Sequence, residues 1–272
     1  MPHRLLTLAT AMVFLGGCLF ASSAAAQVST CAAERQTQIA QENKDMPVVL
    51  QVLAEINVRG LPALNAHVDD LTLVLSHAPA AEIAPCDGTL YRRLAGVRAS
   101  TAETAQAVAA IQARDPGAKV VVLGLSPYPL ASGLVGTAYV ERGAWDKADK
   151  AMQPGLRLNP LDVRLVNEES LALSHLGRAA EAIVLCDRFL AAATGLTPAI
   201  HARILRTRGF ALGEAGRCDD AIASYEDSLR IEPDNGLAKN EISYLLKRKS
   251  GAPAQAPVIL DSGKGAAVKP QR

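Results

Sequence analysis

Two stretches of the chain end in the same way, and their likeness is the feature that most constrains the fold. Gly143 to Pro160 reads GAWDKADKAMQPGLRLNP, and Gly216 to Pro233 reads GRCDDAIASYEDSLRIEP. Each has an alanine five residues after its glycine, a large side chain four residues later, and a Leu-Arg pair shortly before the closing proline. This spacing is typical of an amphipathic helix that follows a glycine turn and stops at a proline. The chain is therefore expected to repeat one helical unit.

A third copy lies between these two. It starts at Gly177 and keeps a small residue, Ala182, at the same distance, with Cys186 where the other copies have a large side chain. Seven residues before each turn glycine, another small residue falls inside a preceding helical pattern. These earlier small residues are Gly136, Ser170 and Gly209, which are 34 and 39 residues apart. The extra residues of the second interval fall in the loop AAATGLTPA, so the three units keep one register.

Together these features resemble the tetratricopeptide repeat (TPR) family, in which a helix, a turn and a second helix recur with small residues at fixed places. The resemblance covers about 129–235. It implies an all-α fold of antiparallel helix pairs, stacked as a right-handed solenoid. We expect the array over 119–248, with repeats at about 129–162, 163–201 and 202–235 and a capping helix at 236–248.

The recurring small residues have a mechanical role in such an array, because larger side chains would push the two crossing helices of a unit apart. The residues expected to pack the repeats are Gly136, Tyr139, Ala148, Pro160, Ala182, Gly209, Ala221, Tyr225 and Pro233. The sequence departs from the family pattern in two ways. The usual tryptophan and leucine of the first helix are missing, and Pro154 is expected to kink or shorten a second helix.

The pattern of residues 1–26 predicts that this stretch is a secretory signal peptide. Arg4 precedes the apolar run LLTLATAMVFLGGCLF, and small residues at Ala24 and Ala26 suit cleavage near Ala26. The expected location is periplasmic or secreted, in a bacterium. Alternatively, the sequence LGGC ending at Cys18 resembles a lipobox, which would make the protein an outer-membrane lipoprotein. Without that lipid, no membrane insertion of the mature chain is expected.

The remaining parts flank the array. Residues 27–118 carry helical patterns without a clean repeat, and we interpret them as an N-terminal helical region, with degenerate repeats as the alternative. The tail 249–272 is rich in Gly, Ala, Pro and Lys and is expected to be disordered. The segment KVVVLGL at 119–125 admits a short strand, but we expect it to lead into a helix of the array. Other helices are expected over 32–59, with a break at Pro47, and over 62–77, 89–98 and 101–114.

Four cysteines follow the leader, and an even number in an exported protein invites pairing. Two antiparallel helices followed by an extended segment would return Cys86 to Cys31, so we expect a disulfide between them. Cys186 and Cys218 are offset by about 10 Å along their helices, which exceeds the reach of a disulfide. We expect Cys186 to be a small buried hydrophobe, with pairing to Cys218 left open. No CxxC or closely spaced histidine pair occurs, so no metal site is expected.

The charges and motifs give little support for catalysis. Lys and Arg number 28 against 27 Asp and Glu, so the chain is nearly neutral and no nucleic-acid partner is expected. HExxH, GxSxG, P-loop and GxGxxG motifs are missing from the sequence. We therefore expect neither enzymatic activity nor a cofactor.

What a helical array offers is a concave surface for another protein or peptide. We expect a non-catalytic scaffold or adaptor of the bacterial cell envelope that binds its partner there. The alternatives are a lipoprotein serving envelope assembly or secretion, and a helical hydrolase or redox protein. The three arginines on this surface resemble the basic grooves with which some TPR proteins hold an acidic peptide terminus, although Gly133 stands where those grooves have a lysine. The residues expected to line the groove are Arg164, Asn167, His175, Arg203, Arg206, Phe210, Asn240 and Tyr244.

Overall fold

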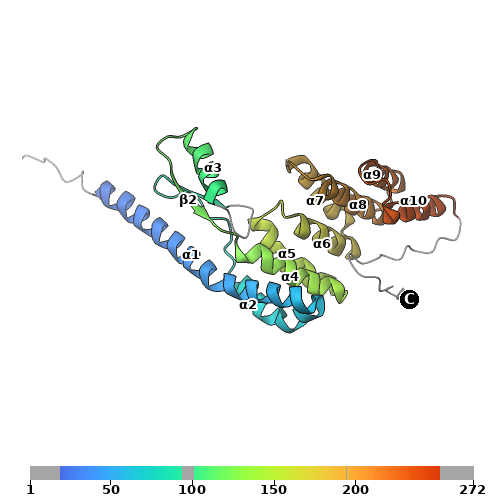
Figure 1. Ribbon diagram of the computed structural model, residues 1–272, viewed down its shortest axis with the longest axis horizontal. Coiled ribbons are helices and arrows are strands. Elements are labelled where there is room, and N and C mark those ends of the chain that lie inside the picture. The colour runs from blue at the N-terminus through green and yellow to red at the C-terminus, as the bar shows by residue number, and fades with distance from the viewer. Residues whose placement is uncertain (1–18, 94–100, 194, 252–272) are drawn as a thin grey trace, which may run out of the picture. The chain divides into compact units, whose positions relative to one another are not determined.

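The computed structural model describes residues 19–93, 101–193 and 195–251 (Figure 1). The predicted disordered tail thus lies almost wholly outside the described residues, as do residues 1–18 of the predicted leader. Contacts between residues divide the chain into two compact units. One unit joins Met1–Gln41 to Ile83–Leu125, and the other joins Glu42–Glu82 to Ser126–Arg272.

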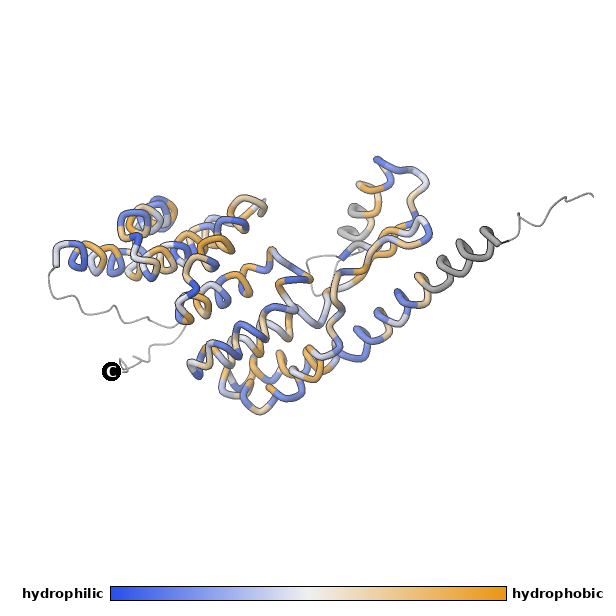
Figure 2. Tube along the Cα trace, turned by 180° about the vertical axis from the view of Figure 1, so that it is seen from behind, coloured by the Kyte–Doolittle hydropathy of each residue, from blue (hydrophilic) through white to orange (hydrophobic). Residues whose placement is uncertain are grey.

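The second unit contains an array of helix pairs. Within a pair, a short turn joins two helices that pack against each other, and the first helices of successive pairs, α4, α6 and α8, also pack together. This is the expected stack of antiparallel helix pairs, with α10 packed on α9 at the end (Figure 1). Figure 2 shows hydrophobic and hydrophilic residues alternating along these helices, as helices with one buried side require. The pairs are α4 (Pro127–Glu141) with α5 (Trp145–Leu158), α6 (Val163–His175) with α7 (Ala179–Ala192), and α8 (Pro198–Glu214) with α9 (Cys218–Ile231), followed by α10 (Gly236–Lys249).

The turn inside each pair depends on glycine. Gly143, Gly177 and Gly216 have φ angles of 64°, 74° and 77°. Side chains other than glycine rarely adopt this left-handed backbone region, which ends a helix and reverses the chain. The three glycines that define the sequence repeat are therefore the residues at which each helix pair turns.

Close packing between the helices of a pair explains the other recurring small residues. A Cβ atom added to Gly136 would lie 2.5 Å from Cγ of Met152, and one added to Gly209 would lie 3.0 Å from the Tyr225 ring. Ala148, on α5, is completely buried. Ala182 and Ala221 occupy the equivalent places of α7 and α9 and are likewise completely buried. Small side chains at these places let the helices approach until the larger residues fill the space between them.

Two glycines on α4 offer a matched test of this packing. Gly136→Ala should lower the free energy of unfolding by about 1–3 kcal/mol, because the new methyl group overlaps the buried Met152 side chain. Gly133→Ala should raise it by about 0.5–1 kcal/mol, because its Cβ would meet nothing closer than Leu165 Cδ2 at 3.8 Å and alanine favours the helix. Urea unfolding of both variants checks this pair. Equal shifts in the same direction would show that α4 and α5 do not cross at Gly136.

The prolines act on helix ends more than on helix interiors. Pro160 and Pro233 follow the last residues of α5 and α9, and both are exposed, so they stop these helices without entering the core. The expected shortening of α5 at Pro154 is wrong: α5 continues through it to Leu158. Pro154 lies close to the C-terminal end of α5, so the helix loses one backbone hydrogen bond near its end rather than at its centre.

The N-terminal part of this unit packs on the first pair. The second half of α1 (Leu19–Arg59) leads into the 3-10 helix η1 (Leu61–His67) and α2 (Val68–Ser76), which contacts α4. Asp45 of α1 is buried, and its carboxylate accepts a hydrogen bond from the Tyr128 hydroxyl at 3.3 Å. The same carboxylate lies 3.0 Å from Nδ1 of His77. The expected break at Pro47 is wrong, because α1 runs through it.

The other unit contains two short parallel strands. β1 (Thr89–Arg93) pairs with β2 (Lys119–Leu123), with Thr89 opposite Lys119, and α3 (Thr101–Gln112) lies between them in the chain and contacts β2. The expected helix at 89–98 is therefore wrong over 89–93, which form a strand, and residues 94–98 lie outside the described part of the chain. The expected helical lead-in at 119–125 is a strand over 119–123. The run Val120–Val122 is β-branched and favours extended backbone, and a helix is the usual connection between parallel strands.

The expected disulfide between Cys31 and Cys86 is present in this unit, with Cα atoms 6.2 Å apart. Cys86 also forms two backbone hydrogen bonds with Thr89, just at the start of β1. Arg35 of α1 donates from Nε to the backbone oxygen of Ala84 at 3.2 Å. The first half of α1 is thus tied to the segment before β1 by a covalent bond and a hydrogen bond. Cys186 and Cys218 are free thiols, and Cys186 is fully buried.

Candidate binding site

A row of aromatic rings crosses three helices of the array. The indole of Trp145, at the start of α5, stacks on the imidazole of His175, at the end of α6, with centroids 4.0 Å apart and 12° between the planes. The Phe210 ring of α8 lies 5.8 Å from the same imidazole and is tilted by 49°. His175 is exposed and the other two are half-buried, so the rings lie at the surface rather than in the core. We call these three residues the aromatic row.

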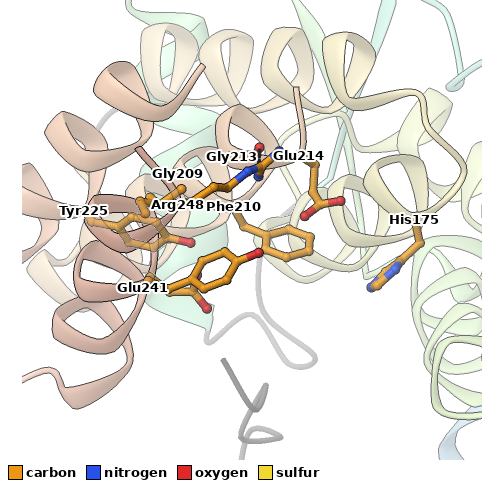
Figure 3. A pocket seen from close by; sticks show the side chains of 10 residues that line it. His175, Gly209, Phe210, Gly213, Glu214, Tyr225, Glu241 and Arg248 are labelled. Atoms are coloured by element: carbon orange, nitrogen blue, oxygen red, sulfur yellow. Dashed lines mark hydrogen bonds between the residues drawn. The ribbon is translucent and has the colours of Figure 1, made fainter. Parts of the chain in front are cut away.

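Two members of this row, His175 and Phe210, also line a pocket of about 170 Å³ (Figure 3). We call it the array pocket. Residues of α8, α9 and α10 form most of its wall, and His175 at the end of α6 adds a contribution from the preceding pair. Gly209 and Gly213 of α8 line the pocket, and their lack of side chains lets Tyr225 and Leu245 approach α8 closely. The other aromatic and charged residues of its wall are Tyr225, Tyr244, Glu214, Glu241 and Arg248.

Glu241 is the most unusual of these charged groups. Its side chain lines the pocket, yet the residue is only 8% exposed, and it has no hydrogen-bond or ion-pair partner among the residues that the structure describes. Burial raises the pKa of its carboxyl to about 7, and the negative charge of Glu214 adds to this rise. At neutral pH the folded protein therefore holds Glu241 as a mixture of the acid and the carboxylate.

Loss of contact with water also shifts the pKa of other titratable groups of the pocket, including the partly exposed His175. Desolvation lowers the pKa of His175, although Glu214 opposes this, so the imidazole is mainly neutral at pH 7. Burial raises the pKa of the Tyr225 hydroxyl, which keeps its proton. Arg248 donates from Nη1 to the backbone oxygen of Gly213 at 3.1 Å. The pocket thus holds two acidic groups and one guanidinium that is already engaged with the backbone.

The structure brings three of the eight predicted groove residues, His175, Phe210 and Tyr244, to the array pocket. Of the predicted arginines, Arg164 pairs with Asp162, the residue that caps its own helix, at 3.0 Å. Arg206 pairs with Glu232 at 2.5 Å. Neither of these guanidinium groups is left without a carboxylate.

The last three predicted residues lie outside the pocket wall. Asn167 accepts a hydrogen bond on Oδ1 from the Thr207 hydroxyl at 2.6 Å, which links α6 to α8. Arg203 and Asn240 are exposed. Their place on a partner-binding surface stays a prediction.

Sequence reasoning missed Trp145, Glu214, Glu241 and Arg248. Trp145 is the single tryptophan of the chain and stands two residues after a turn glycine, which is a signal that the sequence does carry. Nothing in the pattern of α10 marks Glu241 as buried, because it lies among the charged residues of a helix that ends in KRK. Its burial depends on the approach of α8 and α9.

A second buried carboxyl lies between the first two pairs. Glu169 of α6 is 1% exposed, and its Oε1 accepts a hydrogen bond from Nε2 of Gln153 at 2.6 Å. Burial raises the pKa of Glu169 to about 9, and the adjacent Asp149 adds to this rise. Burial alone would raise the pKa of Asp149 as well, but hydrogen bonds from Glu169, Gln153 and Arg178 outweigh it and lower that pKa. Glu169 is therefore the protonated partner, and Asp149 is ionised beside Arg178 at 2.6 Å.

Two further features concern metals and membranes. Within the described part of the chain, Cys31, Cys86 and Asp87 form the one group with side-chain atoms close enough to share a metal ion. The two sulfur atoms are bonded to each other, so the donor set does not suit a metal. Among the same residues, no helix combines the length and the apolar character that crossing a membrane requires.

Comparison with known proteins finds similarity in solved structures alone, because no family model and no curated protein matches the chain. The first TPR domain of human RPAP3 is 22% identical with a TM-score of 0.41, over 46% of this chain and 94% of that one. The first TPR of Spaghetti (RPAP3), bound to the HSP90 peptide SRMEEVD, is 23% identical with a TM-score of 0.40, over 45% and 94%. MamA of AMB-1 is 23% identical with a TM-score of 0.36, over 45% and 69%. Each of these three matches covers less than half of this chain.

Proposed function

We propose that this protein is a non-catalytic interaction module that binds a segment of a partner polypeptide along the aromatic row and the array pocket. The observation that carries the proposal is the contiguous set of rings from Trp145 through His175 to Phe210, which leads into a pocket of about 170 Å³. Aromatic side chains held at a surface supply large contact areas with little loss of conformational entropy on binding.

The size of the pocket favours a side chain over a free small molecule. Sites for drug-sized ligands enclose about 300–1,000 Å³, which is well above the volume found here. The row extends the contact beyond the pocket, as binding a polypeptide segment requires. The array then acts as a scaffold or adaptor, with the helix pairs holding the rings in place.

The proposed location is the envelope of a bacterium, outside the cytoplasm. The leader-like N-terminus and the bond between Cys31 and Cys86 support it, because structural disulfides persist mainly in oxidising compartments. Mass spectrometry of the chain recovered from a Gram-negative host should find a first residue near Gln27. A diacylglycerol-modified Cys18 at the N-terminus would instead establish the outer-membrane lipoprotein.

Selection from a displayed library of random dodecapeptides tests the binding function. We expect the full chain to enrich peptides whose affinity falls about tenfold in Phe210→Ala, because one aromatic contact of a binding site contributes about 1–2 kcal/mol. His175→Ala, which changes an exposed ring, should weaken the same peptides and guards against a folding defect in the first variant.

Val184→Ala is the matched control. Val184 lies on α7 and is exposed, outside the row and the pocket. Thermal unfolding of the three variants should match that of the unmodified chain. The proposal fails if no peptide is enriched, or if the enriched peptides bind the Phe210 and His175 variants as well as they bind the Val184 variant.

A further inference from the structure

The array pocket has a definite chemical character beyond its aromatic walls. Its charged groups are Glu214, Glu241 and Arg248, and Arg248 already donates to the backbone oxygen of Gly213. Figure 3 shows Glu214 and Glu241 on either side of the Phe210 ring in this view. A ligand inside the pocket therefore meets an acidic environment, because the two carboxylates outnumber the single guanidinium.

Glu241 points to the ligand most directly. It is more than nine-tenths buried, lines the pocket, and has no hydrogen-bond or ion-pair partner among the described residues. Burying a carboxylate without a partner is unfavourable, and buried charges in folded proteins are normally paired. The partner that this position lacks is a cation or a hydrogen-bond donor.

The aromatic walls favour the cation. The faces of phenylalanine and tyrosine rings attract ammonium and guanidinium groups by about 0.5–2 kcal/mol, more where water is excluded. Phe210, Tyr225 and Tyr244 all line the pocket, and Tyr225 is almost completely buried. An apolar ligand would use these rings but would leave Glu241 buried and unpaired.

We propose that the array pocket docks a lysine or arginine side chain of a partner peptide, with Glu241 as its ion-pair partner and Phe210 and Tyr244 as its aromatic walls. This inference rests on the proposed function and specifies the ligand class of the same site. It reverses the charge that the arginines had suggested for the partner, since Arg164 and Arg206 are neutralised by Asp162 and Glu232.

Binding of a cation should be linked to pH. The groups that face Glu241 are Glu214, Arg248, His175 and the Tyr225 hydroxyl, with Arg206 near Tyr225. Burial raises the pKa of Tyr225, so its hydroxyl keeps its proton over this range, and burial lowers the pKa of His175, which favours the neutral imidazole. Glu241, with a pKa of about 7, then loses its proton when the cation binds. Affinity should rise about tenfold from pH 6 to pH 8, as the ionised fraction of Glu241 rises.

Three acetylated and amidated heptapeptides provide the probe. They read Gly-Ala-Leu-X-Leu-Ala-Gly, with lysine, norleucine or glutamate at X, and binding to the full chain is followed by NMR of the backbone amides. The lysine peptide should shift amides of α8 and α10 and bind about tenfold more tightly than the norleucine peptide, since an ion pair with one cation–π contact contributes about 1.4 kcal/mol. The glutamate peptide should bind most weakly.

Two matched variants distinguish a specific ion pair between Glu241 and the peptide lysine from a general effect of the protein's charge. Glu241→Gln should lower affinity for the lysine peptide about tenfold, remove its pH dependence and leave the norleucine peptide unchanged. Glu226→Gln removes an equal charge from an exposed site on α9 and should change nothing. Circular dichroism and thermal unfolding establish that both variants are folded.

The outcomes distinguish this inference from the function it rests on. Equal binding of the lysine and glutamate peptides, or unchanged lysine affinity in Glu241→Gln, overturns the cation pocket. The interaction module still stands in that case if dodecapeptides selected on the chain require Phe210. Replacing Lys264 and Lys269 of the tail with glutamine should leave binding unchanged. If it instead strengthens binding of the lysine peptide, the pocket belongs to this chain's own lysines and the partner assignment is wrong.

Discussion

The free energy of unfolding of the array should fall as the pH rises from about 5 to about 9, and Glu169→Gln should remove most of that fall. Burial raises the pKa of Glu169 from 4.5 to about 9. The folded state therefore keeps a proton that the unfolded chain releases above pH 4.5. Stability is fully present below that pH and is lost progressively until the pH passes about 9.

The size of this effect is large. At pH 7, which is about 2.5 units above the ordinary pKa of a glutamate, loss of the Glu169 proton stabilises the unfolded chain by roughly 3 kcal/mol. The folded chain, which keeps this proton, does not gain that stabilisation. Glutamine imitates the protonated acid, because its amide can donate toward Asp149 while its oxygen accepts from Gln153. The Glu169→Gln variant should therefore be more stable than the unmodified chain at pH 7 by on the order of 3 kcal/mol.

Urea unfolding at pH 5, 7 and 9 measures this slope. Glu226→Gln, at an exposed position, is the control and should keep the slope of the unmodified chain. Glu241 contributes a smaller slope of the same sign that ends near pH 7, where its own pKa lies. The pKa of Asp149 is lowered, so its contribution lies below pH 4 and does not enter this range. A slope in Glu169→Gln equal to that of the unmodified chain would show that Glu169 is ionised in the folded protein.

Replacing Cys31 and Cys86 together with serine should destabilise the unit that joins Met1–Gln41 to Ile83–Leu125 by about 3 kcal/mol. A disulfide stabilises mainly by restricting the unfolded chain, and the effect grows with the loop that it closes. The two cysteines are 55 residues apart, which predicts about 4 kcal/mol if the whole chain unfolds. If the array stays folded, Glu42–Glu82 remains ordered inside the loop, and the shorter flexible part predicts about 3 kcal/mol.

Hydrogen exchange of the amides of β1 and β2 measures this loss locally. Protection in Thr89–Arg93 and Lys119–Leu123 should fall in the double variant, and a reducing agent should have the same effect on the unmodified chain. Cys218→Ser changes a free thiol and should leave protection unchanged. Unchanged protection in the double variant would mean that the strands do not depend on the disulfide.

The repeat was predictable because its signals are local. Each turn has a left-handed backbone, which favours glycine, and each helix crossing leaves room only for a small side chain. Both requirements recur at fixed intervals in the sequence. Gly155 shows the limit of this reasoning. A Cβ there would lie 2.6 Å from that of Ser132 and 2.7 Å from Leu165, yet no matching glycine in the other units marks it.

The strands were missed for a related reason. Val120–Val122 is extended because it pairs with Leu90–Arg92, about 30 residues earlier in the chain. A short apolar run does not distinguish a strand from a buried helix segment by its own pattern. The pairing partner decides between them, and it is found only when the chain has folded.

The sequence by itself determined the helix pairs, their turns and the disulfide, because each follows from backbone geometry or from spacing along one or two helices. It also placed three aromatic residues of the pocket, His175, Phe210 and Tyr244, on the binding surface. The tertiary structure alone decided the charge of the site. Arg206 is neutralised by Glu232, just after the end of α9, whereas Glu241 is buried without a partner among the described residues. Whether a charged side chain is available for binding depends on which groups the fold brings within a few ångströms of it, since electrostatic attraction and desolvation both act over that distance.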